Sequence, residues 1–318
     1  MILLMTDTIL ELKKQEKNTL YIIGNGFDLY HGYKTSYHDF YNWLIAHNCE
    51  DFVSNMEKIF PTLSGKEYLL WKDFEDALGR FDLLKIHHEF FQGRNDSFYD
   101  ENVQKRAVKR IKPILQNIAV FLKDWLLDID IEKKEKKLSL SSNSQYLTFN
   151  YTLLLERKYN IPGNHILHIH NSLISNIPLI TGHRHLVSED DYLGNNVNEE
   201  KSTQLIANEM NGLYKPVEQL IKSHQYFFNS LKDISNVVVF GHSLAMIDRL
   251  YLKEVQRQIQ DNSHWYFIAK DDNGIANYQN YVKTYNKQYD GSYGLIIGDY
   301  QFNKKMIENN CKYIKTNN

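Results

Sequence analysis

Two glycines separated by one residue, Gly24 and Gly26, directly follow a short apolar run, and this spacing is typical of a loop that binds phosphate. Because glycine has no Cβ, its backbone can adopt positive φ and turn N–H groups toward an anion. Asp28 follows, and its carboxylate could accept a hydrogen bond from a ribose hydroxyl or cap the next helix. The loop residues Gly24, Asn25, Gly26 and Phe27 are therefore predicted to bind the phosphates of a nucleotide.

Polar residues also follow the other apolar runs of the sequence. Thr148, Asn150 and Tyr151 come at the end of one run, and His168 and His170 come at the end of the next. Open α/β sheets bind ligands at the carboxyl ends of their strands, so these side chains are expected to line one crevice. The residues predicted to line it after a later run are Gly241, His242, Ser243 and Asp248.

Asn150 and His170 carry the chemistry predicted for this crevice. An asparagine can orient a water molecule and ribose hydroxyls, and a histidine can act as a general base near neutral pH. With Asp28, they could hydrolyse the glycosidic bond of a nucleotide, which needs an oriented water and stabilisation of an oxocarbenium-like transition state. The structural alternative is that Asn150 only forms an Asx turn and caps the following helix.

A second group of histidines leaves a metal-dependent alternative open. His183 and His185 follow Gly182, and this spacing is similar to the Gly-His-x-His of binuclear metallophosphoesterases. Together with His168 and His170, they could bind a metal ion for a phosphoesterase or nuclease, although the other motifs of such enzymes are missing. A further alternative is a sensor that binds a nucleotide and signals by assembly without turnover.

The elements that must position these residues alternate between strands and helices, which is typical of a parallel sheet. We therefore expect an α/β protein with a Rossmann-like, mostly parallel sheet and a helical insertion after the first strand. Residues 1–35 and 141–318 are predicted to form the nucleotide-binding core, and residues 36–140 the insertion. The predicted strands are 19–24, 145–149, 165–169, 178–181, 237–240, 265–268 and 295–297, and the predicted helices outside the insertion are 6–17, 201–231, 246–260 and 274–286.

The composition is that of an ordinary globular protein. With 318 residues, a net charge of -2 and 42% hydrophobic residues, it indicates no general affinity for membranes or nucleic acid, although a basic stretch at 105–112 leaves nucleic acid open as a partner. Cys49 and Cys311 match no metal-binding spacing, which favours a reducing compartment. No apolar run approaches the roughly 18 residues of a membrane helix, so a cytoplasmic location is expected.

Several of these motifs together resemble those of the AbiH family of bacterial abortive-infection proteins. The similarity covers residues 24–40, 71–75, 148–156, 168–170 and 241–248, and so spans most of the chain. One departure is Asn171, where the family pattern usually has glycine. The resemblance implies antiphage defence, in which the cell arrests or dies before the phage matures. With this resemblance, a phage-derived component could be the trigger of the protein, and the protein could form a homo-oligomer.

A weaker resemblance is to sirtuin-like NAD-binding folds. It rests on the order of a Gly-rich loop, Thr-x-Asn-Tyr, His-x-His and Gly-His-Ser-Leu. In those folds the loop binds the pyrophosphate, an asparagine positions the nicotinamide ribose and water, and a histidine is the base. The resemblance implies NAD as substrate or ligand, with no further cofactor and no metal required. The Cys-x-x-Cys pairs of the sirtuin zinc ribbon are absent, so protein deacetylation is not expected.

Overall fold

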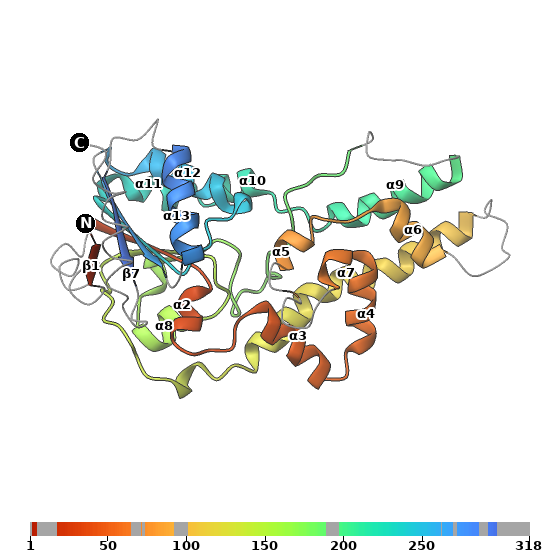
Figure 1. Ribbon diagram of the computed structural model, residues 1–318, viewed down its shortest axis with the longest axis horizontal. Coiled ribbons are helices and arrows are strands. Elements are labelled where there is room, and N and C mark those ends of the chain that lie inside the picture. Colours follow the sequence, from red (N-terminus) through yellow and green to blue (C-terminus); the bar gives the residue numbers. More distant parts are fainter. Residues whose placement is uncertain are drawn as a thin grey trace. The chain divides into compact units, whose positions relative to one another are not determined.

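The computed structural model describes residues 2–4, 18–64, 71, 74–91, 101–188, 197–261, 263–269, 272–285 and 292–297. Its contacts group the chain into two compact units (Figure 1). Unit 1 consists of residues 1–33, 130–172 and 217–318, and unit 2 of residues 34–129 and 173–216. The predicted helix at 6–17 lies outside the described residues. Whether these units are the folding domains predicted from the sequence stays a prediction.

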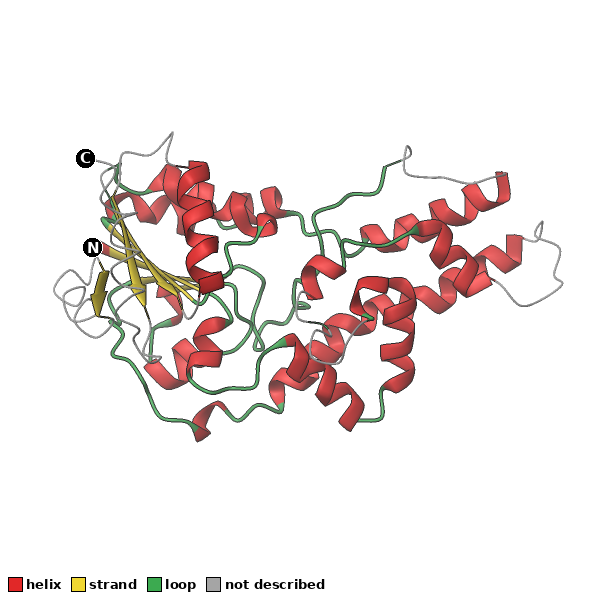
Figure 2. Cartoon of the chain, in the orientation of Figure 1, coloured by secondary structure: helices red, strands yellow, loops and turns green. Residues whose placement is uncertain are grey.

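Unit 1 is built on a parallel sheet of seven described strands, in the order β1-β7-β6-β5-β2-β3-β4. Figure 2 shows the strands in yellow. Each pair of neighbouring strands is parallel. The strands are β1 (Ile2–Leu4), β2 (Thr19–Ile23), β3 (Gln145–Thr148), β4 (Ile166–His168), β5 (Asn236–Phe240), β6 (His264–Ala269) and β7 (Ser292–Ile297).

From β2 the chain adds β3 and β4 on one side and then β5, β6 and β7 on the other. This is the Rossmann order, with β1 added at the edge beyond β7, and it confirms the predicted fold class. The switch point of such a sheet lies between the strands where the direction reverses, here β2 and β5.

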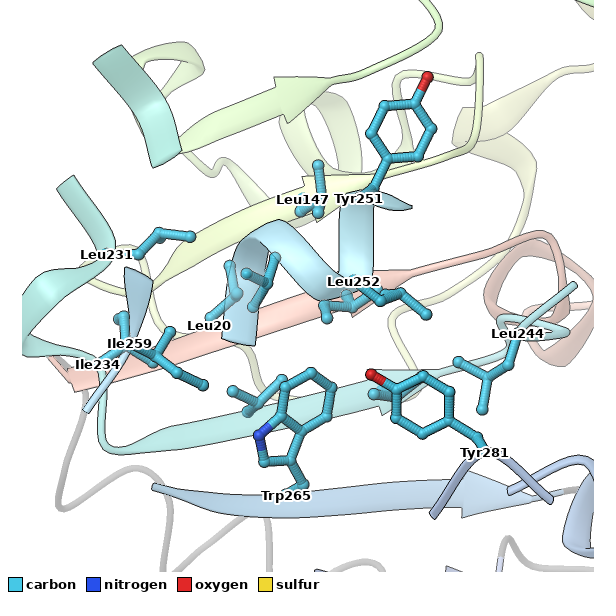
Figure 3. Close-up of a cluster of buried hydrophobic side chains, with 14 of the residues drawn as sticks. Leu20, Leu147, Leu231, Ile234, Leu244, Tyr251, Leu252, Ile259, Trp265 and Tyr281 are labelled. Carbon is cyan, nitrogen blue, oxygen red and sulfur yellow. The ribbon is translucent and has the colours of Figure 1, made fainter. Parts of the chain in front are cut away.

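The central strands are mostly apolar because both faces of the sheet are covered. All residues of β2 and β5 are buried, which is the pattern of a parallel strand rather than of a half-exposed one. On one face, Leu20 and Trp265 pack in a single cluster with Tyr251 and Leu252 of α12 (Figure 3). On the other face, the rings of Tyr21 and Tyr146 stack with centroids 5.0 Å apart.

The helices of unit 1 connect these strands. They are α2 (Gly26–Tyr30), α8 (Leu154–Tyr159), α10 (Val217–Ser223), α11 (Gln225–Asn229), α12 (Arg249–Gln258) and α13 (Asp272–Tyr285), with short 3-10 turns η3 (Ile131–Lys133), η4 (Gly163–His165), η6 (Ser230–Asp233) and η7 (Met246–Asp248).

Unit 2 is helical. It contains α3 (Tyr37–Ala46), α4 (Glu50–Ile59), η2 (Pro61–Leu63), α5 (Phe74–Ala77), α6 (Leu83–Phe91), α7 (Glu101–Leu127) and α9 (Val197–Asn211). α3 begins with a capping box between Ser36 and Asp39, and Pro113 lies inside α7, which continues through it. Residues 178–181, which were predicted as a strand, form none. They lie in this unit, outside the sheet, so the prediction from their short apolar run was wrong.

A buried ion pair also lies in unit 2. The Lys215 side chain is completely buried, and its Nζ donates to Glu75 Oε1 at 2.9 Å. The pair fixes the 173–216 segment to α5 of the same unit. None of the helices that the structure describes has the length and apolar character needed to cross a membrane.

Candidate functional site

The loops that follow β2 and β5 contact each other directly through their backbones. Gly24 N–H donates to Phe240 O at 3.0 Å, and Gly26 N–H donates to Gly241 O at 2.9 Å. A Cβ at Gly24 or Gly26 would lie 2.6 Å from backbone atoms of the facing loop, and Gly241 has a φ of 67°. The three glycines are therefore required by the close approach of the two loops at the switch point of the sheet.

The same contacts use amide groups of the loop predicted to bind phosphate. Besides those of Gly24 and Gly26, the N–H of Phe27 is engaged, because it donates to Gly24 O at 2.9 Å. The Phe27 ring is buried and packs edge-on against Phe240, with centroids 5.2 Å apart. Phosphate binding by Gly24, Asn25, Gly26 and Phe27 stays a prediction, and backbone packing gives the glycine spacing a second physical reason.

Asp28 connects the loop after β2 with the loop after β3. Asn150 Nδ2 donates to Asp28 Oδ1 at 2.9 Å and to Gly24 O at 3.1 Å. Thr152 Oγ1 donates to Asp28 Oδ2 at 2.6 Å. The N–H of Asn150 in turn donates to Thr148 Oγ1 at 3.1 Å. Both carboxylate oxygens of Asp28 therefore accept a side-chain hydrogen bond, and the Asn150 amide is held from two sides.

Burial shifts the titration of Asp28. The residue is only 2% exposed, and desolvation raises the pKa of its carboxyl to about 6. Hydrogen bonds from Thr152 and Asn150 and the nearby charge of His168 act in the opposite direction but do not outweigh burial. A carboxyl group that titrates this close to neutrality at a strand end is a common property of functional sites.

Neither Asn150 nor Asp28 acts as the helix cap that the sequence left open as an alternative. α8 begins at Leu154 after the N-cap Leu153, which makes no side-chain cap bond, so Asn150 does not cap this helix. Asp28 lies inside α2, whose N-cap is Asn25, and its oxygens bond to the β3 loop instead. The purely local interpretation of both residues was wrong, because their partners lie far away in the sequence.

His168 is held between a carbonyl and a carboxylate. Its Nδ1 lies 2.8 Å from Asn150 O, and its Nε2 lies 2.7 Å from Glu156 Oε1. A carbonyl oxygen can only accept, so Nδ1 carries a hydrogen and donates it to Asn150 O. His168 therefore connects the Glu156 carboxylate to the backbone of Asn150.

His170 is placed differently from His168. β4 ends at His168, so His170 lies in the turn that follows the strand. The His170 ring is buried and makes edge-to-face contacts with Phe149 and Tyr251, at centroid distances of 5.5 and 5.7 Å. The opposite neighbour of Phe149 is His242, whose ring centroid lies 4.2 Å away. Phe149 thus lies next to both histidine rings.

The tautomer of His242 is set by the loop after β5. Leu244 N–H donates to His242 Nδ1 at 2.9 Å, so the ring hydrogen of the neutral form is on Nε2. That nitrogen lies 3.5 Å from Asp248 Oδ2, and both side chains are buried. Ser243, by contrast, is exposed. The structure therefore brings His242 and Asp248 together at the carboxyl end of β5.

The histidines of the metal-dependent alternative do not form one cluster within a unit. His168 and His170 belong to unit 1, whereas His183 and His185 belong to unit 2. His183 Nε2 lies 3.2 Å from Met210 O, and desolvation lowers the pKa of this buried imidazole. Across the described ranges, no three His, Cys, Asp or Glu side chains are placed to hold a metal ion.

Two contacts of the site were not predicted from the sequence. Thr152 donates to Asp28, and Glu156 holds His168, yet neither was singled out as a site residue. The available signal was position, since Thr152 lies in the loop after β3 and Glu156 in the first turn of α8, both within six residues of Asn150. Spacing from the strand end could have identified them, but their partners could not be known.

Comparison with known proteins places these elements in a family. The family model described as bacteriophage abortive infection AbiH matches residues 20–269, from β2 to β6. No curated protein matches the chain, and no solved structure does. The match covers most of the chain and includes each of the strand ends described above. The chain therefore belongs to the AbiH family of bacteriophage abortive infection proteins.

Proposed function

We propose that this AbiH protein acts in phage defence by hydrolysing NAD or a related nucleotide at the carboxyl edge of its sheet. One observation carries the proposal. In a sheet with Rossmann strand order, Asp28 and Asn150 are bonded to each other across the ends of β2 and β3, beside the switch point. Nucleotides bind at this place in open parallel sheets.

In the proposed reaction, the residues have distinct roles. Asn150 orients the water and the ribose through its side-chain Oδ1, because its Nδ2 already donates to Asp28 and Gly24. His170 is the general base that accepts a proton from the water as the glycosidic bond breaks. The carboxylate of Asp28 holds Asn150 in place and adds negative charge that favours an oxocarbenium-like transition state.

The other predicted site residues are assigned to parts of the nucleotide away from Asn150, His170 and Asp28. The loop residues Gly24, Asn25, Gly26 and Phe27 are assigned to the phosphates, and His168 to the ribose side. The pocket residues assigned to the rest of the nucleotide are Thr148, Tyr151, Gly241, His242, Ser243 and Asp248. Depletion of NAD is one direct way in which such an activity would arrest an infected cell.

The first test measures nicotinamide release from NAD by the purified protein, together with NAD levels in infected cells. The variant is His170→Gln, and the matched control is His165→Gln, because His165 lies at the opposite end of β4. We expect the control to hydrolyse NAD and to deplete it during infection, and the His170 variant to do neither.

Two results would contradict the proposal. If cells remain protected while NAD is unchanged, the chemistry is wrong. In the second result, the purified wild-type protein binds NAD tightly but releases no nicotinamide, and infected cells do not lose NAD. The protein would then be a sensor that binds its ligand without turnover. Unfolding temperatures of all variants distinguish a lost base from a lost fold.

A further inference from the structure

Glu156 is the first acidic residue after β3. It lies in the first turn of α8, and its Oε1 is 2.7 Å from His168 Nε2. The side chains of Glu156 and His168 are 22% and 11% exposed, so the pair lies near the surface without being solvated on all sides. His168 is itself fixed by Asn150 O at 2.8 Å, and Glu156 is thereby tied to the proposed centre.

The second oxygen of this carboxylate has no donor. Glu156 Oε2 is buried and accepts no hydrogen bond from any residue that the structure describes. A carboxylate oxygen in such a position is costly unless a donor reaches it. The Glu156 side chain is 22% exposed, so a ligand can approach its carboxylate from the surface. A ligand that offers a hydrogen-bond donor would satisfy the second oxygen.

The strand order indicates which donor this is. In the Rossmann arrangement, a carboxylate that follows the second strand of the core accepts a hydrogen bond from the 2′-hydroxyl of the adenosine ribose. That second strand corresponds here to β3, which lies directly beside β2 and is followed by Glu156. The segment between β3 and Glu156 contains no other acidic residue. We propose that Glu156, positioned by His168, accepts a hydrogen bond from the 2′-hydroxyl of an adenine nucleotide.

This inference rests on the proposed nucleotide binding, but it can be tested without turnover. The probes are ADP and 2′-deoxy-ADP, which differ only in the 2′-hydroxyl and contain no nicotinamide. The proteins are the full-length wild type, Glu156→Gln and the matched control Glu132→Gln, whose carboxylate is 64% exposed on the surface of the same unit. Dissociation constants are measured by calorimetry for each pair.

We expect the wild type and the control to bind ADP about tenfold or more tightly than 2′-deoxy-ADP, because a hydrogen bond to a charged acceptor is lost. In Glu156→Gln this ratio should approach one, while the affinity for 2′-deoxy-ADP changes little. Glu156→Asp keeps the charge but shortens the side chain, and it should also lose the preference.

Equal affinities of the wild type for the two nucleotides would overturn the inference, even if no variant can be purified. A preference that persists in Glu156→Gln would also overturn it, while leaving nucleotide binding intact. If the wild type binds neither ADP nor 2′-deoxy-ADP, the role of Glu156 is refuted. Nicotinamide release from NAD by the same preparation then decides separately whether the proposed hydrolase fails as well.

Discussion

Asn150 donates to Asp28 Oδ1 at 2.9 Å, although the two residues are 122 positions apart in the sequence. The bond joins the loops after β2 and β3, which are the two neighbouring strand ends on one side of the switch point. Because each partner is buried, the bond contributes to stability as well as to the geometry of the proposed site.

Removing the Asn150 side chain should destabilise the protein. Asn150→Ala takes a donor from the buried Asp28 carboxylate and from Gly24 O, and such a loss costs about 1–3 kcal/mol in the free energy of unfolding. Urea denaturation measures this loss. Asn164→Ala is the control, since Asn164 is exposed, and it should change stability little. Equal stabilities of the two variants would contradict the role of the bond.

The raised pKa of Asp28 predicts a defined pH dependence of stability. Between the ordinary value of 3.8 and the folded value of about 6, the folded protein binds more protons at this site than the unfolded chain does. The free energy of unfolding of the wild type, compared with that of Asp28→Asn, should therefore fall as the pH rises through this window. The fall should reach up to roughly 3 kcal/mol, with no further change at higher pH. Denaturation of both proteins from pH 4 to pH 8 tests this. A difference that stays constant across the series would show that Asp28 titrates normally.

Alanine at the switch-point glycines should be poorly tolerated. A Cβ at Gly24 would lie 2.6 Å from Gly241 O, and one at Gly241 would lie 2.3 Å from Phe27 N in a backbone with positive φ. Either substitution must separate the two loops, at a cost of about 1–3 kcal/mol or more. Thermal unfolding of Gly24→Ala should show this beside Gly163→Ala, since a Cβ at Gly163 meets nothing within 4 Å. Similar melting temperatures for both variants would refute the close approach.

Unit 2 should depend on its buried ion pair. Glu75→Gln leaves the completely buried Lys215 ammonium without its carboxylate, and breaking such a pair costs about 3–5 kcal/mol. Asp76→Asn is the adjacent control, because its contact with Arg80 joins two side chains that are each at least 60% exposed. Replacing both members, as Lys215→Met with Glu75→Leu, should recover most of the loss. A double variant less stable than Glu75→Gln would argue against the pair as the cause.

The sequence was most informative about elements whose signal is local. The apolar runs at β2 and β5 predicted buried parallel strands because every residue after the first in each strand is apolar. β1, only three residues long, was not recognised as a strand. Residues 178–181 were misassigned, since a short apolar run shows burial but not pairing.

The site itself was only partly accessible from the sequence. The strand-end positions of Asp28 and Asn150 could be predicted, and the structure shows them bonded to each other. The roles of Thr152 and Glu156 depend on which loops approach each other, and no local pattern encodes that. The contact made by the glycines was not encoded locally either. Their spacing suggested phosphate binding, whereas their N–H groups donate hydrogen bonds to the end of β5 and the loop after it.

The order of the strands also has a consequence for the synthesis of the chain. Ile23, at the end of β2, pairs with Thr148 in β3 and with Phe240 in β5. The ribosome therefore releases this fully buried strand long before either neighbour exists, and helices of unit 2 are translated in the interval. During that time β2 has both hydrogen-bonding edges open, which is the condition that favours aggregation of nascent chains. Production of this protein should consequently depend on chaperones that shield β2 until its neighbouring strands are translated, and slow folding is expected from such distant pairings.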